Sequence, residues 1–255
     1  MKISCPICEG ACLPLDVVDF NKSCGVNGEH LPLSLIPIYY FLCEDCGFCF
    51  APEFSKWKLK DFASKIYNDE YVQVDPEYVD ARPRANARNL LTLFGEHGPR
   101  IRHLDYGGGK GLLCEFLVKS GWQSTSYDPF VDRDSRLEDL GKFDLITSFE
   151  VFEHVSDVRR LVSDLSSLLV KNGVVLFTTL LSDGHLGPRQ RLNWWYASPR
   201  NGHISLFSKR SLSFLGAKEG FHLGSFSPEF HAFWWHIPPW AAHIIRETPG
   251  AGARP

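Results

Sequence analysis

Two short cysteine motifs in the N-terminal part of the chain have a spacing that suits zinc. Cys5 and Cys8 form one CxxC knuckle, and Cys43 and Cys46 form the other. Such a knuckle lets two thiolates from one tight turn occupy adjacent corners of a tetrahedron around the metal. Two knuckles fill all four corners and leave no open position for water. We therefore expect a structural zinc that fastens a small lobe without a core of its own.

The number of cysteines is compatible with this zinc site. The sequence has 8 cysteines and starts without an apolar leader segment, so metal ligands and reduced thiols are expected in preference to disulfides. Cys12, Cys24 and Cys49 are spare in this assignment. A ligand set that includes Cys24 or His30 remains an alternative.

A second chemical signal is the segment HLDYGGGKGLL, residues 103 to 113, at the end of an apolar run. It places an acid before glycines at every second position: Asp105, Gly107, Gly109 and Gly111. A GxGxxG dinucleotide motif is excluded because the sixth position from Gly107 is Leu112. A P-loop is excluded because Lys110 is followed by glycine. What remains is a glycine turn on which a ligand can lie against bare backbone.

The acids near this turn indicate the kind of ligand. Asp105 ends the strand before the glycines and suits a cation such as an ammonium or a sulfonium better than it suits phosphates. S-adenosylmethionine carries both cations. Asp128 ends the next strand, in TSYDPF, at about the separation from the glycine turn at which an acid hydrogen-bonds a ribose diol.

Strand, glycine turn, helix, strand and acid follow one another in this order, and the chain here resembles the class I S-adenosylmethionine-dependent methyltransferases over residues 85–224. The form EVFEHV at residues 150–155 looks like the small-molecule branch typified by ubiquinone-type O-methyltransferases. The Asn/Asp-Pro-Pro-Tyr motif of enzymes that methylate amino groups of bases or glutamine is missing there. The resemblance implies cofactor contacts from Asp105, Tyr106, Gly107, Gly108, Gly109, Asp128, Pro129, Phe149 and Glu150.

The same EVFEH turn contains side chains that could act on the acceptor. Glu150, Glu153 and His154 have i, i+3 and i+4 spacing, which places them on one face of a helical turn. Similar turns, joined by a distant histidine, hold a divalent ion in some diol-recognising methyltransferases of this fold, and His203 is the candidate here. Such an ion would lower the pKa of a substrate hydroxyl. The alternative is that His154 acts alone as a general base, with Glu150 ordering the cofactor loop.

The elements that must position these residues alternate strand and helix. We expect strands at 101–106, 122–128, 142–149 and 174–181, and helices at 85–94, 111–121, 156–173 and from 209 onwards. Ser156 and Gly173 are the expected caps of the third helix, and Ser208 is the expected N-cap of the last. This alternation predicts an α/β fold, a doubly wound and mostly parallel sheet, with a small N-terminal zinc-binding lobe.

Two segments near the C-terminus are rich in aromatic residues. The long insertion 182–207 contains Trp194, Trp195 and Tyr196, which could wall an acceptor pocket or simply pack as a lid. Its arginines could hold an anionic substrate; they are Arg189, Arg191 and Arg200. The segment FHAFWW, residues 230–235, could be a final edge strand, and the residues after it could cap the acceptor pocket or form a homodimer contact.

Composition excludes several classes of protein. The formal net charge is −3 and the basic residues are scattered, which disfavours nucleic acid as a partner. No run reaches the ~18 apolar residues of a membrane span, so a soluble, cytoplasmic protein is expected. The expected domains are a zinc-ribbon-like lobe at 1–54, a helical bridge at 55–98, the methyltransferase domain at 99–248 and a disordered tail at 249–255.

These observations predict an S-adenosylmethionine-dependent methyltransferase that acts on a small molecule. The acceptor group is expected to be a hydroxyl, as on a sugar or a secondary metabolite, and the zinc is expected to be structural. One alternative is an RNA base methyltransferase whose zinc lobe grips RNA. Another is a module that binds S-adenosylmethionine without catalysing transfer.

Overall fold

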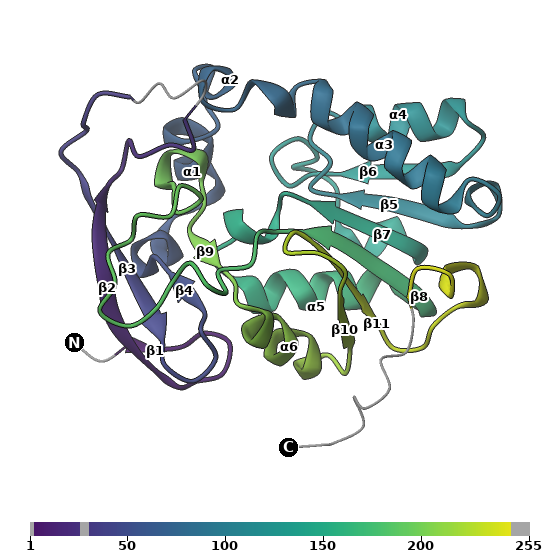
Figure 1. Ribbon diagram of the computed structural model, residues 1–255. Helices are drawn as coiled ribbons and strands as arrows, with labels where there is room; N and C mark the ends of the chain where they lie inside the picture. Colours follow the sequence, from purple (N-terminus) through teal and green to yellow (C-terminus); the bar gives the residue numbers. More distant parts are fainter. Residues whose placement is uncertain (1–2, 26–30, 246–255) are drawn as a thin grey trace.

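The computed structural model describes residues 3–25 and 31–245, which form two β-sheets with helices (Figure 1). His30 and the PGAGARP segment, expected as an alternative ligand and a disordered tail, lie outside the described residues. Within the described part of the chain, no helix is both long enough and apolar enough to span a membrane.

The larger sheet has six strands. Their spatial order is β10 (His222–Ser225), β11 (Phe230–Trp234), β8 (Leu169–Thr178), β7 (Phe143–Phe149), β5 (Arg102–Tyr106) and β6 (Gln123–Tyr127). β6, β5, β7 and β8 run parallel, and β11 is antiparallel to both of its neighbours. The chain leaves β5 toward β6 on one side and later returns to β7 on the other side. The carboxyl ends of β5 and β7 therefore flank a topological switch point, where such sheets bind ligands.

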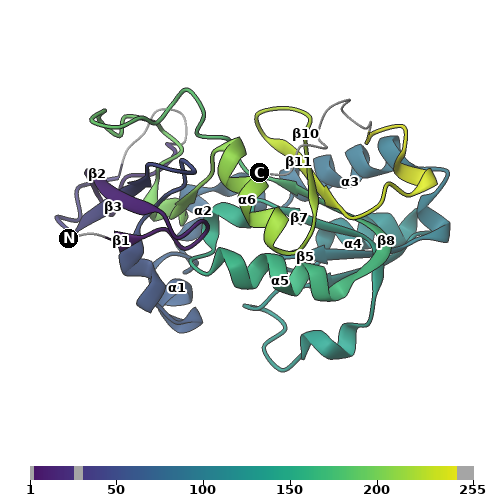
Figure 2. The ribbon, with the colours of Figure 1, turned by 90° about the horizontal axis from the view of Figure 1, so that it is seen from below.

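Helices cover both faces of this sheet, as the alternating sequence pattern predicts. One face carries α3 (Ala81–Phe94) and α4 (Leu112–Lys119), and the other carries α5 (Val158–Leu168) and α6 (Lys209–Lys218) (Figures 1 and 2). Alternate residues of β8 divide between the two faces: Val174 and Leu176 pack with α3 and α4, while Val175 and Phe177 pack with α5 and α6. The predicted doubly wound α/β fold is thus confirmed.

The predicted boundaries of the third helix were wrong. α5 begins at Val158 with Asp157 as its N-cap, whose carboxylate accepts a hydrogen bond from the backbone N–H of Arg160, so Ser156 is not the cap. The helix ends at Leu168, and β8 starts immediately. Gly173 lies inside β8, where a Cβ would come 2.8 Å from the carbonyl oxygen of Asp144 on β7. The glycine lets β8 lie close to β7 at this point, and it does not cap a helix. The Ser208 cap of α6 is confirmed.

The N-terminal lobe is built on the smaller sheet. Its strands in spatial order are β1 (Ile3–Ser4), β2 (Ala11–Asp19), β3 (Pro37–Cys43), β4 (Cys49–Phe50) and β9 (Ser205–Leu206). Every neighbouring pair in this sheet is antiparallel. β9 comes from the long insertion, so residues far apart in the sequence complete one sheet. The lobe lies beside the edge of the large sheet where its parallel strands end (Figure 1).

The segment between the two sheets is mostly helical. It contains α1 (Leu59–Lys65) and α2 (Tyr71–Val74) before it reaches α3. Single 3-10 turns occur at Pro52–Lys56, Pro76–Tyr78, Gly98–Arg100, Leu137–Leu140, Phe152–His154, Pro199–Asn201 and Pro239–Ala241. The domain limits at residues 54 and 98 stay predictions.

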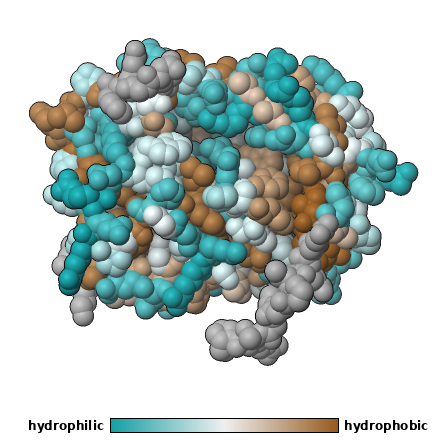
Figure 3. Space-filling model, viewed as in Figure 1, coloured by the Kyte–Doolittle hydropathy of each residue, from teal (hydrophilic) through white to brown (hydrophobic). Residues whose placement is uncertain are grey.

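The aromatic C-terminal segment differs from its predicted placement. β11 is not an edge strand, because it lies between β8 and β10. Beyond it the chain packs on α3, where the rings of Phe94 and Trp240 are 5.4 Å apart and Leu93 O is 2.7 Å from His243 Nε2. This is the amino-end edge of the parallel strands, so the segment does not cap a site at their carboxyl ends (Figure 1). Hydrophobic surface gathers toward the right of the view in Figure 3, and a homodimer contact through the C-terminal segment stays a prediction.

Candidate active site

The glycine turn connects β5 to α4 at the switch point. Gly107, Gly109 and Gly111 have φ values of +82°, +55° and +80°, a backbone conformation that residues other than glycine rarely adopt. A Cβ on Gly107 would lie 2.4 Å from a methyl carbon of Val151. The turn is anchored to the neighbouring strand because the N–H of Gly107 donates to the carbonyl of Tyr127 at 2.7 Å. Only at Gly109 does the turn border open space, since no atom lies within 4 Å of the position of a Cβ there.

Asp128 lies against this turn, as its position after β6 predicts. Its carboxylate accepts hydrogen bonds from the N–H of Gly109 at 3.0 Å and from the N–H of Phe130 at 2.8 Å. The residue is only 9% exposed. Each carboxylate oxygen still has a lone pair that could receive a ribose hydroxyl. Asp128 thus shapes the turn and keeps acceptor capacity for a ligand.

Asp105 lies beneath the glycine turn. Its carboxylate is buried beneath the turn, where it accepts a hydrogen bond of 2.6 Å from the hydroxyl of Thr147. Burial raises its pKa to about 6, and the hydrogen bond from Thr147 partly offsets the rise. A Cβ on Gly108 would lie 2.6 Å from Asp105 Oδ2. The side chain therefore supports the turn from below, and this geometry does not present it for a direct ion pair with a cationic ligand.

Glu153, His154 and His203 converge next to the turn. A carboxylate oxygen of Glu153 and one ring nitrogen from each histidine lie within 4.8 Å of one another. Glu153 Oε1 lies 4.0 Å from His154 Nε2 and accepts a hydrogen bond of 2.6 Å from the hydroxyl of Tyr196. His203 Nδ1 lies 2.8 Å from the carbonyl oxygen of Tyr196. Three of the four residues predicted for a metal or a base are thus brought together.

Glu150 does not belong to this group of three. It follows β7 with a φ of +54°, outside the single 3-10 turn that holds Glu153 and His154, so the assumed helical face does not form. The Glu150 N–H donates to Thr178 Oγ1 at 2.9 Å, and that hydroxyl donates to Glu150 Oε1 at 2.9 Å. This arrangement fits a residue that orders the loop after Phe149, the second role expected for Glu150.

Burial is the main cause of the pKa shifts of the ionisable groups in this site. It raises the pKa of Glu153 to about 8, with a further contribution from the nearby Glu150 carboxylate. It lowers the pKa of His154 to about 4, assisted by the positive charge of Arg82, and lowers the pKa of His203 well below its usual value. Both imidazoles are therefore neutral near pH 7, and each has one nitrogen lone pair available.

The aromatic insertion contributes to the site, whereas Arg200 and Arg191 within it are engaged elsewhere. Trp194 and Tyr196 are buried, and Trp195 is 53% exposed. Arg200 is buried and donates to the carbonyl of Ile66 at 2.9 Å, so it is not available to an anionic substrate. The expectation for Arg200 was wrong because a buried guanidinium must hydrogen-bond to nearby acceptors, which leaves its N–H groups unavailable to a substrate.

Arg191 is also engaged outside the site. It is exposed and pairs with Asp16 of the N-terminal lobe at 3.1 Å. It therefore links the insertion to β2.

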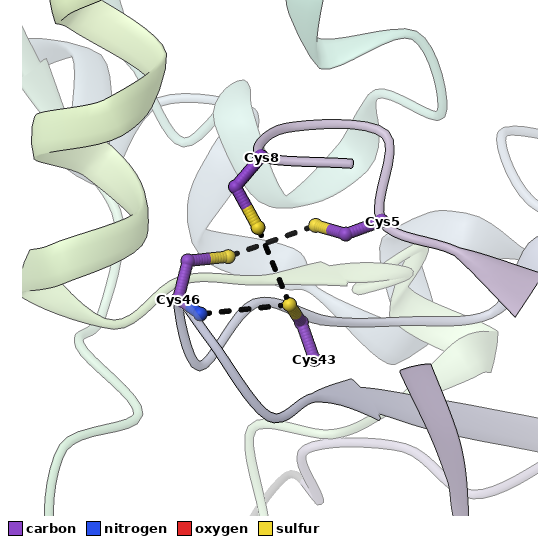
Figure 4. A group of neighbouring side chains, drawn as sticks. All are labelled: Cys5, Cys8, Cys43 and Cys46. Carbon is purple, nitrogen blue, oxygen red and sulfur yellow. Dashed lines mark hydrogen bonds between the residues drawn. The ribbon is translucent and has the colours of Figure 1, made fainter. Parts of the chain in front are cut away.

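The four predicted zinc ligands are clustered in the N-terminal lobe. Their Sγ atoms all lie within 4.8 Å of one another and point toward one centre (Figure 4). Sγ of Cys5 is 3.6 Å from that of Cys46, and Sγ of Cys8 is 3.4 Å from that of Cys43. Zn–S bonds of about 2.3 Å in a tetrahedron require S···S distances of about 3.8 Å, so the cluster fits zinc with little movement. Cys24 lies elsewhere, 3.7 Å from His203 Nδ1.

Two residues of the bridge reach the site and were not predicted. The ring of Tyr67 lies 6.1 Å from that of His154, centroid to centroid. Arg82 makes a bidentate pair with Asp75, with both contacts at 2.9 Å, and its charge acts on Glu150. The only sequence signal was the recurrence of tyrosines in the bridge, at Tyr67, Tyr71 and Tyr78. Nothing in their spacing indicates which of them faces a residue far along the chain.

Known proteins share sequence or fold features with this chain. A family model described as "Methyltransferase domain" matches residues 78–225. A ubiquinone biosynthesis O-methyltransferase of Rhodopseudomonas palustris (strain HaA2) is 30% identical over 116 residues, covering 37% of this chain and 44% of that protein. Its counterpart in Nitrobacter winogradskyi is 32% identical over 116 residues, with 37% and 42% covered. The chain thus spans less than half the length of these curated relatives.

Solved structures provide a further comparison. The Burkholderia thailandensis 1,6-didemethyltoxoflavin-N1-methyltransferase, with bound 1,6-didemethyltoxoflavin and S-adenosylhomocysteine, has a TM-score of 0.47 and 16% identity. The match covers 74% of this chain and 95% of that one.

Proposed function

The chain belongs to the methyltransferase-domain family, and we propose that it transfers a methyl group from S-adenosylmethionine to a hydroxyl of a small-molecule acceptor. The family match confirms the resemblance predicted from the glycine turn and the EVFEH segment. One observation carries the proposal: the glycine turn with Asp128 and the cluster of Glu153, His154 and His203 lie at the same edge of one sheet. A cofactor surface and a group able to take a proton are therefore adjacent.

The chain's own residues fit this cofactor. The backbone of Gly107 to Gly109 would receive its methionyl part, and Asp128 would accept hydrogen bonds from its ribose hydroxyls. The loop at Phe149 and Glu150 would face the methionyl end. When bound, S-adenosylmethionine supplies a methyl group already activated on a sulfonium. The protein must then position the nucleophile in line and remove its proton.

His154 is the proposed proton acceptor. Its imidazole is neutral near pH 7, and its Nε2 faces the carboxyl group of Glu153. Because its pKa is about 8, the Glu153 carboxyl group is mostly protonated near pH 7, so it offers the ring a polar neighbour and not a full negative charge. Glu153 in turn is held by the hydroxyl of Tyr196.

A divalent ion is the second candidate for this step. Glu153, His154 and His203 would hold it, and Glu153 Oε2 and His154 Nδ1 are buried without a hydrogen-bond partner among the described residues. A hard ion there would lower the pKa of an acceptor hydroxyl. Glu150 would not be a ligand in this arrangement, because its carboxylate is engaged with Thr178.

The nature of the acceptor is inferred from charge and from relatives. The net charge of −3 does not favour a nucleic-acid substrate. The relatives named ubiquinone biosynthesis O-methyltransferases favour an O-linked product on a small molecule. A sugar or a secondary metabolite with a free hydroxyl is the proposed class. A reducing compartment such as the cytoplasm fits the four-thiolate site, which disulfide formation would destroy.

The proposal is tested with labelled methyl donor. The protein is incubated with methyl-tritiated S-adenosylmethionine and, in parallel, with a small-molecule extract and with total RNA. Label in the small-molecule fraction is the expected result. Label confined to RNA would favour the RNA methyltransferase. Calorimetric binding of the cofactor without transfer to either pool would favour a non-catalytic binding module.

A further inference from the structure

A turn of the N-terminal lobe presents apolar side chains to solvent. It lies just before β3, where Leu33 is 73% exposed, Leu35 is 83% exposed and Ile36 is 54% exposed. The outer face of the small sheet continues this surface, because Tyr39 on β3 and its strand partner Val17 on β2 are also exposed. These five side chains are called the leucine surface below. The turn lies on the side of the lobe away from the large sheet (Figure 1).

Hydrogen bonds fix the conformation of this turn. One carboxylate oxygen of Asp19 accepts from the N–H and the hydroxyl of Ser34, both at 2.9 Å, and the other accepts from the N–H of Leu35 at 2.8 Å. The carbonyl of Ile36 accepts a hydrogen bond of 2.9 Å from the N–H of Phe20. The fold therefore holds the leucine surface in place.

Leu35 occupies a strained position in the turn. Its φ is +61°, in the left-handed region that a bulky residue rarely adopts and that glycine adopts readily. The side chain gains little from burial within the protein, since most of it is exposed. Strained backbone of this kind is concentrated at binding sites. A leucine kept in this position indicates a partner outside the chain.

A basic stretch lies next to the leucine surface. Residues 56–65, KWKLKDFASK, contain four lysines and a single acid, and all four lysines are exposed. None of their ammonium groups has an ion-pair partner in the described part of the chain. The ring of Trp57 lies 6.2 Å from that of Phe20, centroid to centroid, and Lys65 Nζ lies 4.6 Å from the centroid of the Trp57 ring. Because Phe20 is bonded to Ile36, the lysines adjoin the apolar turn.

Apolar side chains beside unpaired lysines fit the surface of a membrane that contains anionic lipids. Its hydrocarbon takes up leucine side chains, and its phosphates attract lysines that lie within about 8–10 Å. A two-fold contact between two copies of the chain is less suited, because it would bring the basic stretches of both copies to the rim of one interface. Nucleic acid would attract the lysines but would leave the leucines uncovered.

We propose that the leucine surface docks on an anionic membrane, with Leu33 and Leu35 inserted among the lipids and the lysines of residues 56–65 at the phosphate groups. The docked protein lies on the membrane and does not span it. The leucine surface lies outside residues 78–225, so the family match does not assign it. The inference also does not depend on the proposed methyl transfer.

The test is sedimentation of the full chain with lipid vesicles. We expect binding to vesicles of phosphatidylcholine and phosphatidylserine, and much weaker binding to phosphatidylcholine alone or at high salt. Leu33→Ser should weaken binding to the mixed vesicles about 10-fold. Lys65→Gln should weaken it about 5-fold, the effect of losing one lysine near an anionic surface. Val118→Ser, which removes an exposed apolar side chain from α4, is the matched control and should bind as the wild type does.

Leu35→Gly separates membrane binding from folding. Glycine adopts a φ of +61° without strain, and the relief of strain offsets the greater freedom of the unfolded chain. The thermal melting temperature should therefore change little. Binding to the mixed vesicles should nevertheless weaken about 10-fold, because the inserted leucine is gone.

The outcomes separate this inference from its rivals. No binding of the wild type to the mixed vesicles would overturn it, as would equal binding by the wild type and Leu35→Gly. A dimer in analytical ultracentrifugation that Leu33→Ser dissociates, without vesicle binding, would assign the leucine surface to a second copy of the chain. Methyl transfer by a wild type that binds no vesicles would reject this inference and keep the proposed function.

Discussion

At the residue scale, Asp128 is proposed to serve both the turn and the ligand. Its oxygens accept hydrogen bonds from the N–H groups of Gly109 and Phe130, and each oxygen keeps a lone pair for the proposed ribose hydroxyls. We expect Asp128→Ala to weaken S-adenosylhomocysteine binding by about 1.5–3 kcal/mol, roughly 10- to 100-fold. Isothermal titration calorimetry measures this. Asp128→Asn keeps one oxygen acceptor and should lose less. An affinity unchanged by Asp128→Ala would reject the ribose assignment.

His103 makes stability depend on pH. The residue is fully buried, with its ring nitrogens 2.7 Å from Ser124 Oγ and 2.9 Å from Thr147 Oγ1, and burial lowers its pKa to about 3. Between pH 6.5 and 3 the unfolded chain binds a proton at this site and the folded chain does not. The free energy of unfolding therefore falls as the pH falls through this window, by about 2 kcal/mol from this group at pH 5.

The contribution of His103 is measured by comparing the pH dependence of the unfolding free energy in a variant with that in the wild type. His103→Gln cannot bind the proton, so its loss of unfolding free energy from pH 7 to pH 5 should be about 2 kcal/mol smaller than that of the wild type. Ser124→Ala keeps the buried imidazole and should keep the wild-type dependence. Urea titrations at both pH values measure these free energies. Parallel pH dependences of His103→Gln and the wild type would contradict the role of His103.

At the scale of secondary-structure elements, the start of α5 offers a clean comparison of adjacent residues. Asp157 caps the helix through Arg160 N, whereas Ser156 makes no cap bond. Asp157→Ala should lower the free energy of unfolding by about 1 kcal/mol, and Ser156→Ala should lower it much less. Thermal or urea unfolding distinguishes them. A larger loss from Ser156→Ala would mean that the helix begins where the sequence alone predicts.

The elements that were predicted correctly are those determined by residues close together in the sequence. The glycine turn needs only positive φ at Gly107, Gly109 and Gly111, and β7 and the second half of β8 are short runs rich in apolar residues. The end of α5 was mispredicted because pairing with β7 extends β8 back to Leu169. Tertiary pairing here overrides a helical pattern.

The candidate site was predicted only in part, for a related reason. Glu153 and His154 are neighbours in sequence, and His203 was found as a distant histidine. The predicted helical face does not include Glu150 because the backbone of Glu150 adopts a left-handed conformation with positive φ. Tyr67 was missed because it meets His154 only through the packing of the bridge against the sheet.

At the scale of the whole molecule, the cysteine cluster is continuous with the main core. Cys5, Cys43 and Cys46 belong to the same buried cluster as the residues between the large sheet and α5. The carbonyl of Cys46 also accepts a hydrogen bond of 2.6 Å from the hydroxyl of Ser208, the N-cap of α6. Loss of the metal should therefore destabilise the large sheet as well as the lobe.

The zinc prediction rests on that continuity. We expect one tightly bound zinc per chain in protein purified without chelator, and its loss in Cys5→Ser or Cys43→Ser. The thermal melting temperature should drop in one cooperative transition that includes the large sheet. Cys49→Ser, a buried thiol outside the cluster, is the control and should retain zinc. Elemental analysis that finds no zinc in the wild type would refute the site.

The central claim is that His154, without a divalent metal, takes the proton of the acceptor during methyl transfer. It is tested most directly by the rate of transfer from labelled S-adenosylmethionine, with and without a chelator weak enough to spare a four-thiolate zinc. We predict that the chelator leaves the wild-type rate unchanged and that His154→Ala lowers it about 10²- to 10⁴-fold. A rate that collapses with chelator and returns with magnesium or manganese would contradict this account in favour of a metal at Glu153, His154 and His203. A rate insensitive to both treatments would contradict both versions.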